Sequence, residues 1–310
     1  MIGTLTMNPC KDRTLTINGF TYGGMNRVQS VRDDASGKGI NVSLVLNALG
    51  VPVRTLGLNF TKGGEWLIGS LRAVDLEYRS ILVEGRLREN IKLFDVASGV
   101  TTELNQKGDF VSPEKQAEFE ALLDKELRDL DVLVLTGSVP QGFPDDYYGR
   151  IARKAAVSGV KTIVDAEGRL LIEAIKARPY MIKPNLYEFQ TAFGLKGARP
   201  QDILVLCREI IRNGVEVVCL SMGAQGAMIV DGQGAFYCRP TEIAVKSTQG
   251  AGDSLVAGIC MAMERGLPLK EMLRLGVICA QGSLILEGTQ LCTKEGFARF
   301  EKVVTVERIA

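Results

Sequence analysis

The sequence contains no histidine in its 310 residues. Imidazole is the base of Ser-His-Asp and Cys-His sites and a ligand of H-E-x-x-H zinc sites, so all of these are excluded. Acid and base chemistry must therefore fall to carboxylates, lysine, tyrosine or cysteine.

Net charge, membrane-length apolar runs and paired cysteines are also scarce. Lys and Arg number 37 against 36 Asp and Glu, so the chain lacks the basic excess that recruits nucleic acid or anionic membranes. No apolar run reaches the roughly 18 residues of a membrane span, and no signal-peptide pattern is present. The seven cysteines include no C-x-x-C pair that would indicate zinc. We expect a cytoplasmic protein with reduced, mostly buried thiols and no nucleic-acid or membrane partner.

The sequence does have a globular composition, with 46% apolar residues, and its length favours one large domain with a small appendage. Short β-branched or leucine-rich runs alternate with amphipathic stretches, which indicates β-α units around a mainly parallel sheet. The fold class is therefore α/β, with ligands at the carboxyl ends of the strands. We predict strands at 131–137, 160–166, 180–185 and 215–223, and helices at 144–158, 168–177, 185–194, 200–213, 250–266 and 267–286.

Two stretches, 13–32 and 88–111, break this rhythm with alternating patterns and glycine-containing turns. Each predicts a β-hairpin or a pair of strands. Together they would form a small β-sheet lid over a core made of 1–12, 33–87 and 112–310. Closure of such a lid excludes water from a site.

The segment Ser247 to Ser254 places small residues directly before an apolar helix. Accessible N–H groups and the helix dipole make this an anion site. Asp253 in the first turn is either a residue that stabilises the dipole or a base beside a bound phosphate.

Two further polar segments carry candidate residues. The loop from Ser36 to Asn41 matches neither a dinucleotide fingerprint nor a Walker loop, and its Lys38 points to a phosphate or sugar contact. In "IKPNLYEFQ", Asn185 and Glu188 either form a capping box or place Glu188 near a Mg²⁺ ion through water.

Two remaining candidates also have ordinary structural interpretations. "SMGAQGAMIV" is a strand, a glycine turn and a strand, which is either a plain hairpin or a backbone platform for a nucleotide. Asp12 is either a surface turn residue or part of the same site.

Taken in order, five motifs resemble those of the ribokinase-like, PfkB-type family of sugar kinases. They are "LTMNPCKD", "SGKGINVS", "IKPNLYEF", "SMGAQGA" and "STQGAGDSLVAG". The resemblance spans nearly the whole chain and implies a three-layer α/β/α core with a mainly parallel sheet plus a small β-sheet lid. Ser36 stands where the family usually has glycine.

The stretches "RENIKL", "TELNQKG" and "TGSVPQG" are similar to those of the phosphosugar branch of the family. The implied activity is ATP-dependent phosphorylation of a ketose monophosphate, foremost fructose 1-phosphate to the 1,6-bisphosphate. Tagatose 6-phosphate and fructose 6-phosphate are the alternative substrates, and a non-catalytic sugar-phosphate sensor is the alternative of another class. The resemblance also implies a homodimer through the lid.

The resemblance further implies roles for particular residues, with ATP and Mg²⁺ as the small molecules bound besides the sugar. Asp253 would be the base, with the amides of Gly250, Ala251 and Gly252 as the anion hole. The substrate would be held by Asp12, Arg27, Gly37, Lys38, Asn41, Arg88, Asn105 and Ser138. The nucleotide would lie against Lys183, Asn185, Ser221, Gly223, Gly226 and Gly282, and Glu188 would act on the metal through water.

Overall fold

The molecule is built on a ten-stranded sheet, in a computed structural model that describes residues 1–195, 197, 199–239 and 241–310. The strand order is β14-β13-β12-β11-β10-β9-β8-β1-β4-β5. The run from β11 to β5 is parallel, and β12, β13 and β14 continue it as antiparallel strands. These strands are β1 (Ile2–Thr6), β4 (Val53–Lys62), β5 (Tyr78–Arg86), β8 (Val132–Thr136), β9 (Lys161–Asp165), β10 (Met181–Ile182), β11 (Val217–Ser221), β12 (Ala227–Val230), β13 (Ala235–Cys238) and β14 (Glu307–Arg308).

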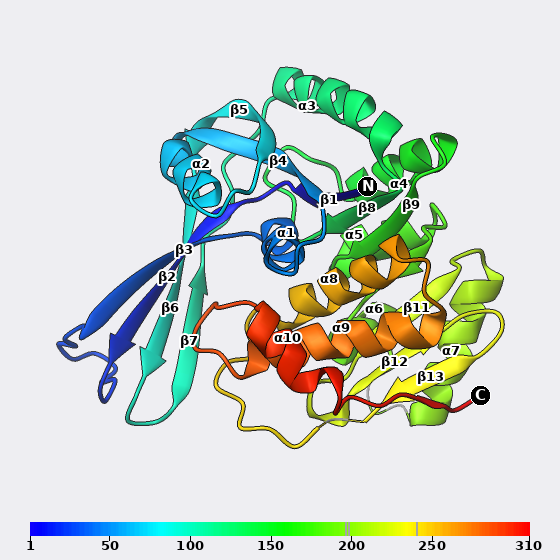
Figure 1. The fold of residues 1–310 in the computed structure, drawn as a ribbon. Helices are drawn as coiled ribbons and strands as arrows, with labels where there is room; N and C mark the ends of the chain where they lie inside the picture. Colours follow the sequence, from blue (N-terminus) through cyan, green and yellow to red (C-terminus); the bar gives the residue numbers. More distant parts are fainter. Residues whose placement is uncertain (196, 198, 240) are drawn as a thin grey trace.

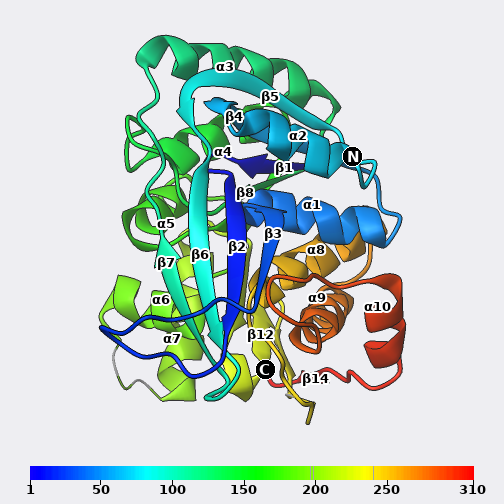
Figure 2. The same ribbon diagram turned by 90° about the vertical axis from the view of Figure 1, so that its left-hand side faces the viewer.

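Helices cover both faces of this sheet and make three layers (Figures 1 and 2). One face carries α1 (Lys38–Ala48), α8 (Ala251–Glu264), α9 (Leu269–Leu284) and α10 (Lys294–Glu301). The other carries α3 (Pro113–Glu126), α4 (Tyr147–Val157), α5 (Gly168–Ile175), α6 (Leu186–Phe193) and α7 (Pro200–Arg212). The short α2 (Gly64–Arg72) packs on β4 and β5.

The central strands are apolar on both faces, which is why helices can pack on each side. In β8, Val132 and Val134 enter the core under α1 and α8, while Leu133 and Leu135 enter the core on the opposite face. Successive side chains of a strand point to opposite faces, so one five-residue strand contributes to two cores.

A second, four-stranded sheet lies beside the core (Figure 2), and we call it the small sheet. Its order is β3-β2-β6-β7, from β2 (Cys10–Ile17), β3 (Ser30–Ser36), β6 (Arg88–Asp95) and β7 (Val100–Asn105). The hairpins β2–β3 and β6–β7 are antiparallel, and β2 pairs with β6 in parallel. The two stretches that broke the β-α rhythm therefore do pair into one sheet.

The α/β fold class is confirmed, and the six predicted helices and four predicted strands are all present. The strand predicted at 180–185 shrinks to Met181–Ile182 because Pro184 has no N–H for the ladder. Partial pairing continues beyond it, since the amide of Lys183 donates to Val164 O at 2.9 Å.

The boundary predicted for the small sheet needs correction. Its strands include residues 10–12 and 33–36, which the sequence analysis assigned to the core. The chain leaves β3 only at Gly37, whose φ of 129° lies in the region that favours glycine. The turn into α1, rather than a change in composition, therefore marks this boundary.

Two further features of the described residues concern helices and cysteines. In the part of the chain that the structure describes, no helix is both long and apolar enough to cross a bilayer. All seven cysteines are buried free thiols.

Close packing of α8 on α9 gives a prediction for stability. A Cβ on Gly258 would overlap the carbonyl oxygen of Leu275 and lie 2.7 Å from the Cα of Gly276. Gly258→Ala should destabilise the protein by about 1–3 kcal/mol, because both contacts are backbone atoms that cannot give way.

Gly69 provides the matched control, because it is also helical but has open space where a Cβ would stand. Gly69→Ala should stabilise the protein by up to about 1 kcal/mol through helix propensity. Denaturant unfolding measures both changes, and equal midpoints for the two variants would contradict the packing argument.

Candidate active site

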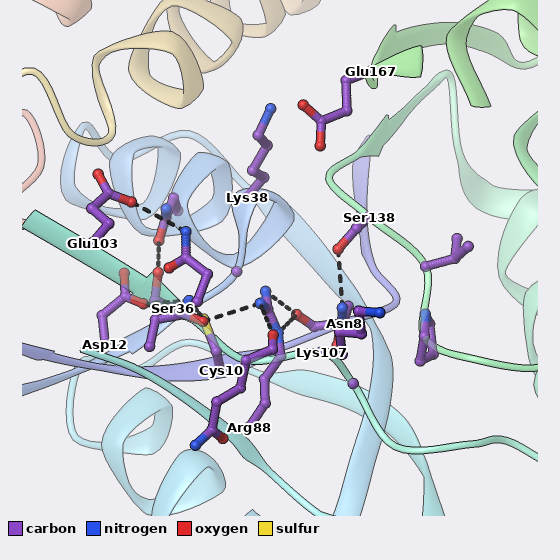
Figure 3. A pocket seen from close by; sticks show the side chains of 18 of the residues that line it. Asn8, Cys10, Asp12, Ser36, Lys38, Arg88, Glu103, Lys107, Ser138 and Glu167 are labelled. Carbon is purple, nitrogen blue, oxygen red and sulfur yellow. Dashed lines mark hydrogen bonds between the residues drawn. The ribbon is translucent and has the colours of Figure 1, made fainter. Parts of the chain in front are cut away.

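A cavity of about 730 Å³ lies between the small sheet and the core (Figure 3). It brings together nine of the predicted site residues from distant parts of the chain, which supports a single site. They are Asp12, Gly37, Lys38, Asn41, Arg88, Asn105, Ser138, Gly250 and Asp253.

Asp253 lies in the first turn of α8 and is only 7% exposed. Asn41 of α1 donates a hydrogen bond from Nδ2 to its Oδ2 at 2.7 Å. Gly250 precedes the helix and has left-handed backbone angles. The amides of the first turn have no intrahelical acceptor, because no helical turn precedes them. The predicted base and anion hole are thus adjacent, and the contact of Asn41 is to the base.

Asp165 at the end of β9 completes a charge cluster that we call the quartet, made of the buried Asp253, Asp165 and Lys183 and the partly exposed Lys38. Lys183 Nζ lies 3.2 Å and Lys38 Nζ 3.8 Å from Asp165 Oδ1, while Thr136 donates to Asp165 Oδ2 at 3.1 Å. Burial opposes ionisation of Asp165, but the two ammonium groups outweigh it and hold its pKa below the ordinary value. Asp165 in turn raises the pKa of Lys38.

Asp253 behaves differently from Asp165. Burial raises its pKa to about 6, against the opposing effects of Lys38 and of the hydrogen bond from Asn41. A carboxylate with this pKa is ionised at neutral pH and is still basic enough to accept a proton. Two carboxylates in one cluster therefore differ in function because their surroundings differ.

The opposite wall of the cavity belongs to the small sheet and centres on Asp12. Asn90 donates to Asp12 Oδ1 at 2.9 Å, and Lys92 Nζ lies 3.7 Å from Asp12 Oδ2. Lys92 also pairs with Glu103 at 3.4 Å. The interpretation of Asp12 as a surface turn residue is therefore wrong, because Asp12 is buried in a polar network that faces the cavity.

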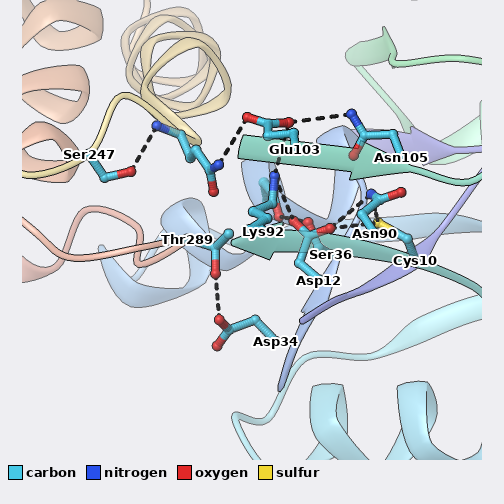
Figure 4. Close-up of polar contacts among 12 residues, drawn as sticks. Cys10, Asp12, Asp34, Ser36, Asn90, Lys92, Glu103, Asn105, Ser247 and Thr289 are labelled. Atoms are coloured by element: carbon cyan, nitrogen blue, oxygen red, sulfur yellow. Dashed lines mark hydrogen bonds and ion pairs between the residues drawn. The ribbon is translucent and has the colours of Figure 1, made fainter. Parts of the chain in front are cut away.

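The small sheet is bonded to the core at both of its edge strands (Figure 4). On β7, Glu103 accepts a hydrogen bond from Nε2 of Gln249, just before α8, at 3.0 Å. On β3, Asp34 accepts a hydrogen bond from the hydroxyl of Thr289, which follows α9. These two contacts close the small sheet over the mouth of the cavity.

Arg88 lies at the cavity, but most of its donors are already used. Its guanidinium donates to the carbonyl of Asn8 at 3.0 and 3.1 Å and to that of Gln106 at 3.1 Å. It also donates to Asn90 Oδ1 at 3.2 Å. Arg88 therefore braces the polar wall and adds positive charge to it.

The predicted nucleotide residues gather at the carboxyl ends of β10 and β11, outside the lining of this cavity. Asn185 and Ser221 form a parallel bridge, and Gly223 and Gly226 make the turn after β11. Lys183 belongs both to this group and to the quartet. Its Nζ also lies near the start of α8, 3.7 Å from where a Cβ on Gly252 would stand.

Three predicted residues lie elsewhere or are already engaged. Arg27 is exposed in the β2–β3 connection, away from the cavity lining. Gly282 is buried within α9, where a Cβ would overlap Cys292 Sγ and lie 3.2 Å from the carbonyl carbon of Gly296, so it serves helix packing, and its nucleotide role stays a prediction. Glu188 completes a capping box with Asn185.

The described residues hold no cluster of three or more His, Cys, Asp or Glu side chains that could bind a metal ion alone. Glu188 uses Oε2 to accept from the amide of Asn185 at 2.8 Å. A single carboxylate, Glu188, fits a Mg²⁺ ion that takes most of its ligands from phosphates and water, which is the usual arrangement in kinases.

The sequence analysis missed Asp165, Lys92 and Glu103. Asp165 could have been found, because it ends a predicted strand at the edge where ligands bind. Lys92 and Glu103 are identified only by the β6–β7 register, which pairs them on the inner face.

A mainly parallel sheet with helices on both faces, a second sheet over its carboxyl edge, and a buried carboxylate beside free helix amides define a phosphotransferase of the sugar-kinase class. A model of the pfkB family carbohydrate kinases matches residues 5–295. The chain belongs to the pfkB family of carbohydrate kinases, and the resemblance inferred from its motifs is confirmed.

The chain is 32% identical over 311 residues to 1-phosphofructokinase of Bacillus subtilis, with 100% of both chains covered. It is 30% identical over 277 residues to tagatose-6-phosphate kinase of Staphylococcus epidermidis, covering 88% of this chain and 89% of the other. The structure of a possible 1-phosphofructokinase of Thermotoga maritima matches with a TM-score of 0.91 at 26% identity, covering 100% and 99%.

Burial of Asp253 predicts a stability gain from Asp253→Asn. The pKa is raised from 3.8 to about 6, so the charged carboxylate penalises folding at pH values above about 6. Asp253→Asn should raise the free energy of unfolding at pH 8 by up to about 3 kcal/mol, at about 1.4 kcal/mol per unit. The gain should shrink as the pH falls from about 6 to 3.8.

Urea unfolding between pH 4.5 and 8 measures this gain. Asp124, an exposed partner of Lys154, is the control, and Asp124→Asn should lower stability by less than about 1 kcal/mol. An Asp253→Asn protein no more stable than the wild type at pH 8 would overturn the assigned burial penalty.

Proposed function

We propose that this protein is a cytoplasmic kinase that transfers the γ-phosphoryl group of ATP to D-fructose 1-phosphate, forming D-fructose 1,6-bisphosphate and ADP. Family membership supports the reaction class, and the full-length similarity to 1-phosphofructokinase of Bacillus subtilis supports the sugar. The buried free thiols are consistent with a reducing compartment.

The observation that carries the proposal is the position of Asp253. Its carboxylate is buried beside the first-turn amides of α8 and opens onto the same cavity as Asp12 and Lys38. A proton acceptor and an anion-binding helix start are thus within one site, with polar groups for a sugar opposite them. A non-catalytic sensor would have no need of a base with a pKa near 6.

The chemistry then follows from the geometry. Asp253 accepts the proton of the primary sugar hydroxyl as its oxygen bonds to the γ-phosphorus. The bond from that phosphorus to the bridging oxygen breaks, and ADP leaves with the electron pair. The amides of Gly250, Ala251 and Gly252 face the charge that develops on the transferred group, an effect often worth 10²-fold or more per donor.

The phosphate already on the sugar needs cationic side chains in the cavity lining. We assign it to Lys38 and Arg88, with Lys92 and Lys107 adding positive charge to the same lining. Asp12, which is braced by Asn90, accepts hydrogen bonds from the sugar hydroxyls.

We place the nucleotide at Lys183, Asn185, Ser221, Gly223 and Gly226, next to the quartet. Glu188 would hold a Mg²⁺ ion through water, and the ion would neutralise phosphate charge. Lys183 pairs with Asp165 and also lies close to the start of α8. We expect its ammonium group to bind the nucleotide phosphates as well when ATP is present.

A substrate panel tests the proposal. Purified protein with ATP and Mg²⁺ should show its highest kcat/KM for fructose 1-phosphate, with fructose 6-phosphate, tagatose 6-phosphate and free fructose as the other arms. Free fructose should be far weaker, because it has no phosphate for the cationic side chains of the cavity to bind. Asp253→Asn should lower kcat by about 10²–10⁴.

A faster reaction with tagatose 6-phosphate or fructose 6-phosphate would replace the proposed sugar and keep the reaction. Binding of a sugar phosphate with no turnover in the wild type would favour the sensor, and wild-type turnover by Asp253→Asn would remove the assigned base.

We also propose that two copies associate through the outer face of the small sheet. Leu15, Val31, Ile91, Leu93 and Leu104 are cross-strand neighbours on this face, opposite the face that carries Asp12 and Lys92. Val31 and Leu104 are 58% and 56% exposed. An exposed apolar patch on a sheet is stabilised when a second copy covers it.

A surface substitution tests the dimer. Leu104→Lys should convert the protein from twice the monomer mass to the monomer mass in light scattering, because a charge would be buried at the interface. Val157 of α4 is 91% exposed and distant from this face, so Val157→Lys should leave the mass unchanged. A wild-type monomer would refute the association.

A further inference from the structure

Ser36 is the last residue of β3, and nothing above gives it a function. It is buried at 4% exposure, and Figure 3 shows it among the cavity side chains near Cys10 and Asp12. Its hydroxyl donates to Asn41 Oδ1 at 3.2 Å. The other end of the same amide donates from Nδ2 to Asp253 Oδ2 at 2.7 Å. One side-chain amide therefore links a hydroxyl of the small sheet to the assigned base.

The orientation of the Asn41 amide decides whether this link helps or harms the base. The oxygen and nitrogen ends of an amide have nearly the same shape, so a half turn would replace a donor with an acceptor against a carboxylate. The carboxylate of Asp253 accepts from the nitrogen end at 2.7 Å, and the Ser36 hydroxyl that donates to the oxygen end at 3.2 Å adds to the preference for this arrangement. Removing that hydroxyl weakens the preference.

The other polar groups around Asp253 cannot supply the same control. Lys38 from α1 and Lys183 after β10 face it with positive charge, and Asp165 at the end of β9 faces it with negative charge. Glu167 and Glu188 act on Lys38 in turn. These groups act on Asp253 through their charge, whereas the Asn41 amide can reverse its effect by turning.

We infer that Ser36 is a positioning residue, which holds the Asn41 amide so that its N–H faces Asp253. The inference rests on the proposed function, in which Asp253 is the base.

The first test is the pH dependence of kcat/KM for fructose 1-phosphate in Ser36→Ala. With the amide free to turn, part of the population presents its oxygen to Asp253 and raises the pKa of that carboxyl. The acid limb of the profile, where kcat/KM falls as Asp253 takes up a proton, should move up by about half to one pH unit. This is the effect of a hydrogen bond of ordinary strength. The KM for ATP should stay within twofold.

Ser43→Ala is the matched control. Ser43 is buried in the same helix as Asn41, bonds Thr4 at 2.6 Å and Thr55 at 2.8 Å, and does not line the cavity. This variant should lose stability without moving the acid limb. A merely structural role for Ser36 predicts the same behaviour for both variants.

A double-mutant cycle makes the test specific. Asn41→Ala should move the acid limb by itself, and adding Ser36→Ala should then move it no further, because no amide remains to be oriented. An acid limb that is unmoved by Ser36→Ala, or that moves equally in the Asn41→Ala background, would overturn the inference.

A readout without activity separates this inference from the proposed function. The free energy of unfolding can be compared, over a range of pH, between proteins that carry Asn and Asp at position 253. The pH dependence of this difference reports the pKa of Asp253 in the folded state. In the Ser36→Ala background, this difference should reach its plateau at a pH higher by about half to one unit, which is about the effect of one hydrogen bond. If no sugar phosphate is turned over, the proposed function fails and this shift still decides the inference.

Discussion

Burial of charge at the carboxyl edge of the main sheet is the constraint on which the rest of the structure depends. Asp165, Lys183 and Asp253 are buried, and they meet the partly exposed Lys38, so four different segments contribute to one charge cluster. Unpaired, each would lose several kcal/mol of hydration, so each needs its partners at fixed distances. The parallel strands supply this precision, because adjacent strand ends bring Asp165 and Lys183 together by register alone. The quartet is neutral when Asp253 is ionised and gains a positive charge when Asp253 takes up a proton.

Two cores hold this edge in place. One packs α1, α8 and α9 on the sheet, and it includes the crossing at Gly258 where backbone meets backbone. Asn41 and Asp253 lie on α1 and α8, so their separation depends on how these helices pack. The second core, under α3 to α7, fixes the opposite face of the strands that carry Asp165 and Lys183. Residues far from the cavity therefore determine its electrostatics.

Much of the scaffold could be predicted from the sequence, and part of the site could not. Alternation in runs such as 131–137 identifies strands buried on both faces, and small residues before an apolar run identify the start of α8. Motif order places Asp253, Lys38 and Asn41 in one site. Lys92 and Glu103 escape this reasoning because their facing depends on pairing between distant strands. A motif match also cannot distinguish a glycine beside a ligand from one that packs against a side chain, as Gly282 packs against Cys292.

The small sheet is bonded to the core through Asp34 on one edge strand and Glu103 on the other. Their partners, Thr289 and Gln249, lie in the last quarter of the chain, whereas the sheet itself comes from the first 105 residues. The sheet is thus not an independent module. In a chimaera that exchanged the two hairpins for those of a relative, the segments around 249 and 289 would have to be exchanged with them. Transplanted alone, the hairpins would keep their internal pairing and lose their closure over the cavity.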